Sequence, residues 1–197
     1  VIVQIGGNHE EIAVLNNLIL VPTPNYRRSA FLDRRVQGLF VRGVGKIWFG
    51  EQVWNDDNAQ LWLSYGLPAF LGLQFYEQYY GKDARIFDFW DWFNPRFREH
   101  FYERMSHQRP QKKQQGIMTP FEASENPPVQ MQLVTYRTAL IIRMLEHLYP
   151  QLFATVLKEF FQKFQGREAT LNDFEQLFAD RGLLLQWFFD QWFRDFQ

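Results

Sequence analysis

Four histidines are the first candidates for metal or acid–base chemistry, and their spacing argues against a paired site. They are His9, His100, His107 and His147. No two of them stand four residues apart, so no helix presents the two imidazoles that often bind zinc on one face. His9-Glu10 begins like the metallopeptidase motif H-E-x-x-H, but position 13 is alanine. We expect His147 near a helix end, where it would interact with the helix dipole.

Motifs of other catalytic classes are also missing from the sequence. The chain has no cysteine, which excludes thiolate metal sites, disulfides and cysteine nucleophiles. Neither Gly6-Gly7 nor Gly43-x-Gly45-Lys46 has the spacing of a phosphate-binding loop. No G-x-S-x-G nucleophile elbow occurs. Adjacent carboxylates such as Asp56-Asp57 are typical of helix capping. The residues therefore show no recognisable catalytic apparatus.

The apolar pattern predicts a small β portion followed by a helical body. Leu18 to Val21 is short, apolar and followed by proline, which indicates a buried strand, and Val1-Ile2-Val3 is strand-like as well. From residue 33 to 50 the apolar residues recur at helical spacing. Gly43 and Gly45 lie inside this predicted helix, and their helix-weakening effect suggests close packing against another element. We expect a mainly α (α+β) fold.

The remainder of the chain is predicted to be helices around one long loop. The helices are expected at Asn58–Tyr80 (kinked or split by Pro68), 88–105, 130–148, 151–164, 170–180 and 183–196, with Gly166 and Gly182 at boundaries. Residues 106–129 are rich in Gln, Lys, Pro and Ser, which indicates a surface loop. We expect a single domain over residues 1–197. Its parts are a strand and loop region 1–32, helices 33–105, the loop 106–129 and a helical subdomain 130–197.

Composition limits the class of partner. Hydrophobic residues make up 46% of the 197 residues and aromatic residues 18%, enough for a large packed core. A formal net charge of -1 gives no electrostatic case for nucleic acid or an anionic membrane. No apolar run reaches the roughly 18–20 residues of a membrane span. The start at Val1, without methionine, suggests a piece of a longer protein with neighbouring domains. The compartment is left open.

Two segments of the chain are R-G-V-G-K-I-W-F-G (residues 42–50) and W-L-S-Y-G-L-P-A-F-L (residues 62–71). They resemble two motifs of the aminopeptidase N family of gluzincin zinc metallopeptidases. That family carries H-E-x-x-H-x-W-F-G on one helix and, after eighteen intervening residues, a glutamate in W-L-N-E-G-F-A on the next. When W-F-G is aligned, Arg42 and Lys46 fall on the two histidine positions. The glutamate position then falls on Tyr65 without a gap.

The C-terminal half carries the resemblance further. Ala139 to Leu148, Thr170 to Phe174 and Trp187 to Trp192 resemble the family's later helices. The resemblance covers roughly Leu18 to Phe193. It implies a thermolysin-like catalytic domain with a small N-terminal sheet portion, two zinc-site helices and a helical C-terminal body.

The resemblance implies a degenerate site, with no metal, no cofactor and no catalytic residue. In the family, two histidines and a glutamate hold zinc, and a second glutamate activates water. Here the ligand positions hold Arg42, Lys46 and Tyr65, and the general-base position holds Gly43. Zinc requires neutral imidazole, thiolate or carboxylate donors, whereas arginine has no lone pair to offer and lysine is a cation. Glycine has no side chain that could accept a proton.

The family's transition-state tyrosine and the motif tryptophans carry further expectations. A gapless alignment puts Thr135 at the tyrosine position, and Tyr136 stands one residue later. The G-x-M-E-N motif, which recognises a substrate's free amino end, is absent upstream. Large aromatic residues are usually packed in a core. We expect core anchors at Trp48, Phe49, Trp62, Trp187 and Trp192.

Two interpretations of the degenerate positions follow. Arg42, Lys46 and Tyr65, with Tyr136, could form an anion-binding cleft that holds, for example, the C-terminus of a peptide. Alternatively, the two cations pair with carboxylates or reach solvent while Tyr65 fills the vacated zinc volume. The usual behaviour of charged side chains on helices favours this second interpretation.

The leading functional hypothesis is a catalytically inactive metallopeptidase-like domain that serves peptide or protein binding, or assembly. The former active-site cleft would hold the bound segment. One alternative is a hydrolase with a relocated site near His100 and His107, although two helical turns separate these residues. The other is a purely structural module that supports a neighbouring domain.

Overall fold

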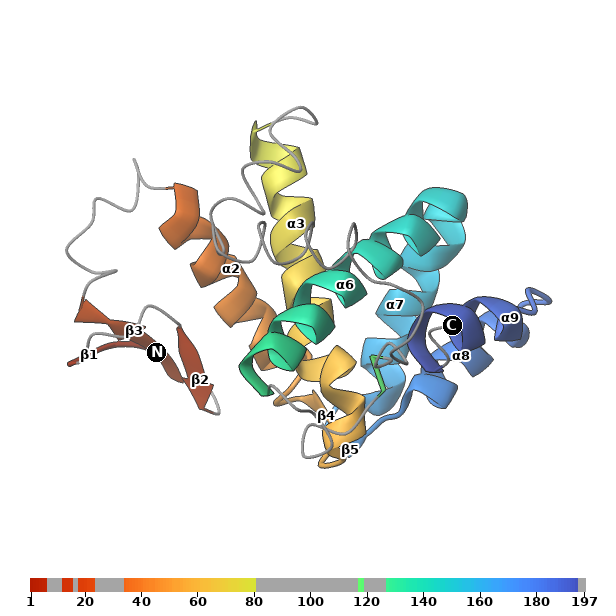
Figure 1. The fold of residues 1–197 in the computed structure, drawn as a ribbon, viewed down its shortest axis with the longest axis horizontal. Coiled ribbons are helices and arrows are strands. Elements are labelled where there is room, and N and C mark those ends of the chain that lie inside the picture. Colours follow the sequence, from red (N-terminus) through yellow and green to blue (C-terminus); the bar gives the residue numbers. More distant parts are fainter. Residues whose placement is uncertain (7–11, 16–17, 24–33, 81–116, 119–126, 195–197) are drawn as a thin grey trace, which may run out of the picture. The chain divides into compact units, whose positions relative to one another are not determined.

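The computed structural model describes residues 1–6, 12–15, 18–23, 34–80, 117–118 and 127–194 (Figure 1). The chain forms two compact units. The first unit consists of residues 1–45 and 71–113, and the second of residues 46–70 and 114–197. Two helices, α2 (Arg34–Trp48) and α3 (Leu67–Tyr80), contribute residues to both units. The helix predicted at 88–105 lies outside the described residues.

The first unit contains a three-stranded sheet in the order β1-β3-β2 (Figure 1). The central strand β3 (Leu18–Pro22) runs parallel to β1 (Ile2–Ile5) and antiparallel to β2 (Ala13–Leu15). Ile19 and Val21 of β3 are buried, as expected for alternate residues of a strand packed on one face. The strand predicted at Leu18–Val21 is confirmed.

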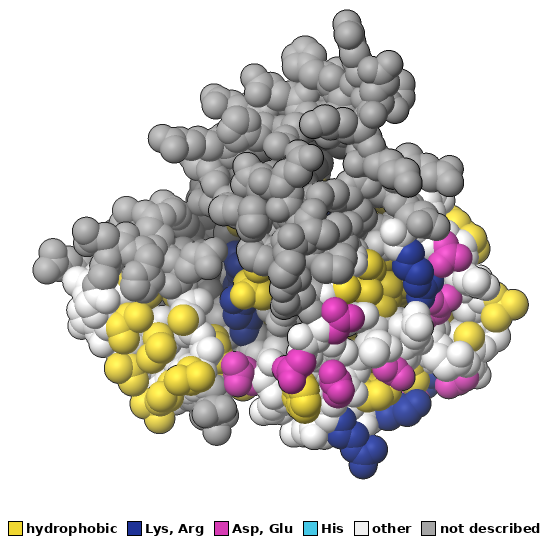
Figure 2. All heavy atoms as spheres, turned by 60° about the horizontal axis from the view of Figure 1, so that its bottom comes forward, with side chains coloured by type: hydrophobic (Ala, Val, Ile, Leu, Met, Phe, Trp, Pro, Cys, Tyr) yellow, Lys and Arg dark blue, Asp and Glu magenta, His cyan; other side chains and the backbone are white. Residues whose placement is uncertain are grey.

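The outer part of this sheet exposes apolar side chains. Val1, Ile2 and Val3 at β1 and Leu15 of β2 are all exposed. Figure 2 shows hydrophobic side chains gathered at the lower left, over this sheet. An apolar surface of this kind often marks contact with another segment or protein.

Pro68 divides the helix that the sequence predicts over Asn58–Tyr80. A short 3-10 turn at Asn58–Gln60 is followed by a π-helical turn at Trp62–Gly66, and α3 begins at Leu67. Proline has no N–H with which to bond the carbonyl four residues earlier, and its ring crowds that carbonyl. The wider π-turn avoids this conflict, and the N–H of Leu67 bonds to the carbonyl of Trp62. The predicted helix at 33–50 is confirmed as α2.

The second unit is a helical body with a two-stranded parallel ribbon. Its elements include α6 (Pro127–Leu148), α7 (Pro150–Phe164), α8 (Leu171–Ala179), α9 (Gln186–Phe189) and a π-helical turn at Asp190–Arg194. The strands β4 (Val53–Trp54) and β5 (Arg167–Glu168) pair side by side (Figure 1). The mainly α, α+β class predicted from the sequence is therefore confirmed.

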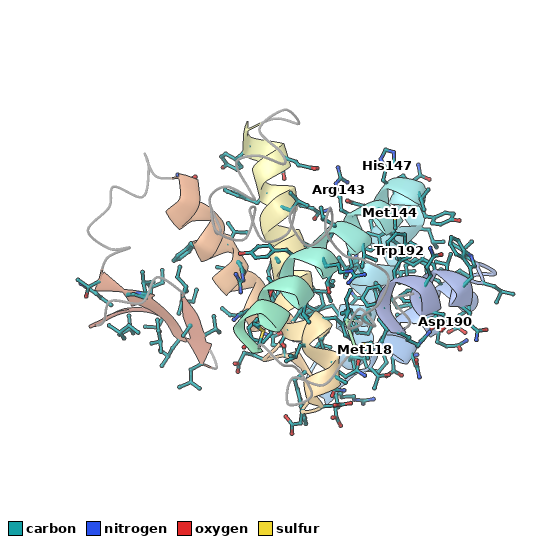
Figure 3. All side chains as sticks on the ribbon, in the orientation of Figure 1. Met118, Arg143, Met144, His147, Asp190 and Trp192 are labelled. Atoms are coloured by element: carbon teal, nitrogen blue, oxygen red, sulfur yellow. The ribbon has the colours of Figure 1, made fainter. Side chains whose placement is uncertain are left out.

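Two predicted boundaries in this unit are wrong. Helix α6 begins at Pro127, three residues earlier than expected, because proline is well tolerated in the first turn of a helix. The predicted surface loop 106–129 therefore ends early, and within it Ile117 is buried. The adjacent Met118 (Figure 3) donates its backbone N–H to the carbonyl of Phe193 at 3.2 Å. The helix predicted to start at residue 183 begins at Gln186, as α9 followed by the π-turn.

Aromatic rings form the core of the second unit. Trp62, Phe160 and Phe174 are fully buried. The ring centroids of Trp62 and Phe174 are 5.6 Å apart, and those of Phe160 and Phe174 are 5.1 Å apart. Phe174 also meets the rings of Phe153, Phe178 and Phe189. Most of these contacts are edge-to-face or tilted, which the ring quadrupole favours.

The prediction that five motif aromatics are core anchors is right in part. Phe49 and Trp62 are buried, but Trp48 is 46% exposed and Trp187 is 59% exposed. Neighbouring residues on a helix point in different directions. Phe188 and Phe189 fill the core next to Trp187, which is turned outward. Trp192 (Figure 3) is half-buried.

The start and end of α8 follow local rules that the sequence shows. Thr170 accepts a hydrogen bond from the backbone N–H of Asp173 at 3.3 Å, and the carboxylate of Asp173 accepts one from the N–H of Thr170 at 2.8 Å. This reciprocal capping box confirms the predicted cap. Gly166 follows the end of α7 and Gly182 follows the end of α8. Their φ angles of 74° and 80° lie in a region that favours glycine.

Replacing the cap is expected to destabilise the second unit. Thr170→Ala removes the acceptor for the N–H of Asp173 and should cost about 1 kcal/mol. For a chain of this size that corresponds to a fall in Tm of about 2–4 °C. Thr155→Ala is the control, because Thr155 is exposed inside α7 and its hydroxyl only bonds back to the carbonyl of Gln151. Equal changes in thermal denaturation would contradict this role for the cap.

Candidate functional site

Helix α2 carries three of the degenerate site positions. Gly43 is buried, and a Cβ built on it would lie 2.9 Å from Cγ2 of Ile12 and 3.9 Å from Cγ2 of Ile19. The close packing predicted at this glycine is therefore confirmed. Arg42 is only 7% exposed, so its side chain is buried. Lys46 is half-buried, one turn further along the helix.

The W-F-G segment turns the chain away from α2. Gly50 has φ of 137°, which a residue with a side chain rarely adopts. Its N–H donates to the carbonyl of Val53 at 2.8 Å. Phe49 stacks on Phe160, with ring centroids 6.4 Å apart. The turn therefore anchors the end of α2 to the helical body and leads directly into β4.

A second set of bonds holds the segment that follows β4. The side-chain oxygen of Gln60 accepts from the indole N–H of Trp62 at 2.8 Å and from the backbone N–H of Leu171 at 3.0 Å. Asn55 donates to the carbonyl of Ala169 at 2.8 Å. These bonds attach the segment to the start of α8. They position the π-turn that carries Tyr65.

The π-turn packs very closely on α6. A Cβ built on Gly66 would lie 2.2 Å from Cγ2 of Thr138. No side chain fits in that space, so the glycine that follows Tyr65 in the motif is required by helix packing. The position of Tyr65 relative to α6 therefore depends on a contact between two small residues.

Lys46 and Tyr65 lie against each other. The ammonium nitrogen of Lys46 is 4.2 Å from the centroid of the Tyr65 ring. This is a cation–π arrangement between the residues aligned with the second histidine and the distal glutamate. Both side chains are half-buried. The structure thus brings two of the three predicted ligand positions together within the second unit, while Arg42 belongs to the first.

The candidates for the transition-state tyrosine occupy α6. Thr135 and Tyr136 are both buried. The hydroxyl of Thr135 donates to the carbonyl of Met131 at 2.7 Å, a bond within its own helix. The assignment of either residue to the family's tyrosine stays a prediction.

The sequence pattern did not single out two further residues of α6, Arg137 and Thr138. Burial lowers the pKa of Arg137 to about 10, because desolvation disfavours the charged guanidinium. Thr138 is fully buried, and its hydroxyl has no hydrogen-bond partner within the described part of the chain. A basic or hydroxyl residue beside Tyr136 is unremarkable in the sequence. The burial of Thr138 arises only once α6 has packed on the π-turn at Gly66.

The described residues contain no group of three or more His, Cys, Asp or Glu side chains that could hold a metal ion. His147 is exposed at the end of α6 (Figure 3), where we expected it, and Arg143 on the preceding turn forms an ion pair with Glu146. His9, His100 and His107 lie outside the described ranges. So do the residues around the alternative, relocated site.

Comparison with known proteins identifies the family. The model of the peptidase family M1 domain matches residues 8–192. The chain belongs to the M1 peptidase family. The recognition based on the two motifs is thereby confirmed, and so is the expected type of fold. No curated protein matches the chain.

Solved structures of M1 peptidases share the fold. A mutant M1 zinc metallopeptidase from Deinococcus radiodurans is 18% identical, with a TM-score of 0.64 over 98% of this chain and 38% of its own. Legionella pneumophila aminopeptidase A in complex with aspartic acid is also 18% identical, with a TM-score of 0.73 over 98% of this chain and 21% of its own. This M1 chain therefore spans well under half the length of either protein. None of the helices in its described ranges has the length and apolar character to cross a membrane.

The contact between Lys46 and Tyr65 should be measurable as a coupling energy. In a cycle of Lys46→Met and Tyr65→Leu, we expect about 0.5–1 kcal/mol of coupling in the free energy of unfolding, the usual range for a cation–π pair at a partly exposed site. Chemical denaturation provides the measurement.

Tyr65→Phe is the matched control, because it keeps the ring and should keep the coupling. The cation–π contact would be contradicted by a coupling energy near zero. It would also be contradicted if Tyr65→Phe lost as much of the coupling with Lys46 as Tyr65→Leu does.

Proposed function

We propose that this M1-family chain is a catalytically inactive peptidase domain that binds a peptide or protein segment. One observation carries the proposal. At two positions aligned with metal ligands, an ammonium group rests on a phenol ring, with 4.2 Å between the nitrogen and the ring centroid.

The chemistry of the donor set supports the inactive half of the proposal. A lysine ammonium has three donors and no acceptor, and it can bind zinc only after losing its proton. The Lys46 ammonium instead lies over the ring of Tyr65, in a cation–π arrangement. The buried Gly43 offers no proton acceptor at the general-base position. The residues at the aligned positions do not fit a zinc ion.

The binding half of the proposal rests on the retained scaffold and on charge. The M1 zinc metallopeptidase of Deinococcus radiodurans has been solved as a mutant bound to a Tyr-Ser-Ala substrate, and this chain matches that structure over 90% of its length with a TM-score of 0.59. A scaffold that has held a peptide provides a surface for one here. Lys46 adds a cation that can bind a carboxylate, such as a peptide's C-terminus.

Neighbouring domains are proposed as further partners. The matched structures are much longer than this chain, which covers 38% and 21% of the two described above. The exposed apolar residues of the N-terminal sheet suit a contact of that kind.

Zinc analysis together with a peptidase assay tests the inactive half. After incubation with zinc and removal of excess metal, we expect substoichiometric zinc in the protein. We also expect no release of product from aminoacyl p-nitroanilides, under conditions where an active M1 aminopeptidase cleaves them. Stoichiometric zinc, or hydrolysis that disappears when Tyr65 is changed, would overturn the proposal.

Calorimetry with the tripeptide Tyr-Ser-Ala tests the binding half. We expect binding without cleavage, with intact tripeptide recovered by mass spectrometry. Lys46→Met should weaken binding about tenfold, because a hydrogen bond to a charged group contributes about 1.5 kcal/mol or more. An amidated C-terminus should weaken it to a similar extent.

Lys163→Met is the matched control for this measurement. Lys163 also lies over an aromatic ring, 5.5 Å from the centroid of Phe164, but at the end of α7. Its replacement should leave tripeptide binding unchanged. The absence of any binding would favour the alternative of a purely structural module.

A further inference from the structure

Gly43 of α2 packs closely against Ile12 in the first unit. The notional Cβ of this residue lies 2.9 Å from Cγ2 and 3.6 Å from Cβ of Ile12. A real Cβ does not approach another carbon this closely, so a side chain at position 43 requires something to move.

Ile12 has little freedom to yield. Its Cγ2 is attached directly to a branched Cβ, which restricts the side chain to few rotamers. Ile12 and Ile19 are each only 6% exposed, so both are packed within the interior of the first unit. A side chain this buried is expected to have little room into which it could rotate.

A glycine elsewhere in the first unit shows that this crowding is local. Gly72 is inside α3, and a Cβ built on it would lie 3.8 Å from the carbonyl oxygen of Gly38 and 4.0 Å from Cβ of Arg42. These are ordinary van der Waals distances. Gly72 can therefore accept a methyl group without any shift, whereas a methyl group at Gly43 requires Ile12 or the backbone to move.

We infer that Ile12 and Gly43 form a complementary packing pair in which Ile12 occupies the volume that a side chain at position 43 would need. The functional meaning rests on the proposed function, which assigns Gly43 to the general-base position. In that case Ile12 excludes a general base from the site by packing. The loss then involves two segments of the chain, and restoring glutamate at position 43 alone would disrupt the contact between α2 and the sheet.

The first test compares two glycine substitutions by thermal denaturation. Alanine normally stabilises a helix interior relative to glycine by about 1 kcal/mol, so Gly72→Ala should raise Tm by about 2–4 °C. Gly43→Ala should instead lower Tm by about 2–4 °C, because overpacking outweighs the gain in helix propensity. An increase for Gly43→Ala equal to that for Gly72→Ala would overturn the inference.

The second test asks whether Ile12 is the cause. Ile12→Ala removes Cγ2, and although it leaves a cavity, Gly43→Ala should no longer lower Tm in this background. Ile12→Val keeps Cγ2, so Gly43→Ala should lower Tm there as much as it does in the native chain. Ile12→Leu, which has no Cγ2 and nearly the native volume, replaces Ile12→Ala if that variant does not fold. The same effect of Gly43→Ala in all backgrounds would overturn the pairing.

The outcomes of these tests are separable from those of the proposed function. Bound zinc and peptide hydrolysis would refute the inactive domain and leave the packing pair standing. Additive changes in Tm for variants at positions 12 and 43 would refute the packing pair. The presence of Lys46 and Tyr65 at the positions aligned with metal ligands would still support inactivity.

Discussion

Burial of Trp62 among phenylalanine rings is the constraint on which the second unit depends. Its ring meets those of Phe160, Phe174 and Phe193, and these residues belong to α7, α8 and the C-terminal π-turn. Trp62 also begins the π-turn that carries Tyr65. Fixing the indole in the core therefore fixes the π-turn, whose Tyr65 is aligned with the glutamate position of the family motif. Large aromatic residues contribute strongly to core stability, so this position is maintained whether or not the segment retains any chemistry.

The motif residues that this chain shares with the family have structural roles. Phe49 packs in the core, Gly50 adopts a positive φ, and Gly66 allows α6 to approach the π-turn. The residues at the positions assigned to chemistry are the ones that differ from the family pattern. Packing constrains the first group, whereas under the proposed function neither a metal nor a reacting water constrains the second. The same few turns of helix can therefore keep the residues that a fold needs without keeping those that an activity needs.

Local rules explain why much of the fold could be predicted. The apolar run at Leu18–Val21, the helical period of α2 and the capping box at Thr170 act over a few residues. The split at Pro68 follows from one missing N–H. The predictions that proved wrong failed for a different reason, because they depended on tertiary packing or on a choice that local rules leave open. Trp48 and Trp187 are exposed because neighbouring phenylalanines take the core-facing positions, a choice that depends on which helices pack together. Pro127 could begin a helix or end a loop, and its sequence neighbours did not decide between them.

The family, the mainly helical class and the residues standing at the zinc-site positions all follow from the order of amino acids, since motif spacing and periodicity are properties of neighbours in the chain. Only the folded chain shows the other features. They are the contact of Lys46 with Tyr65, the space that Ile12 takes beside Gly43 and the desolvation of Arg137. Each of these joins residues from different elements or depends on what an element packs against. Distance and desolvation between such residues are set by how helices and strands pack, and linear spacing carries no measure of either.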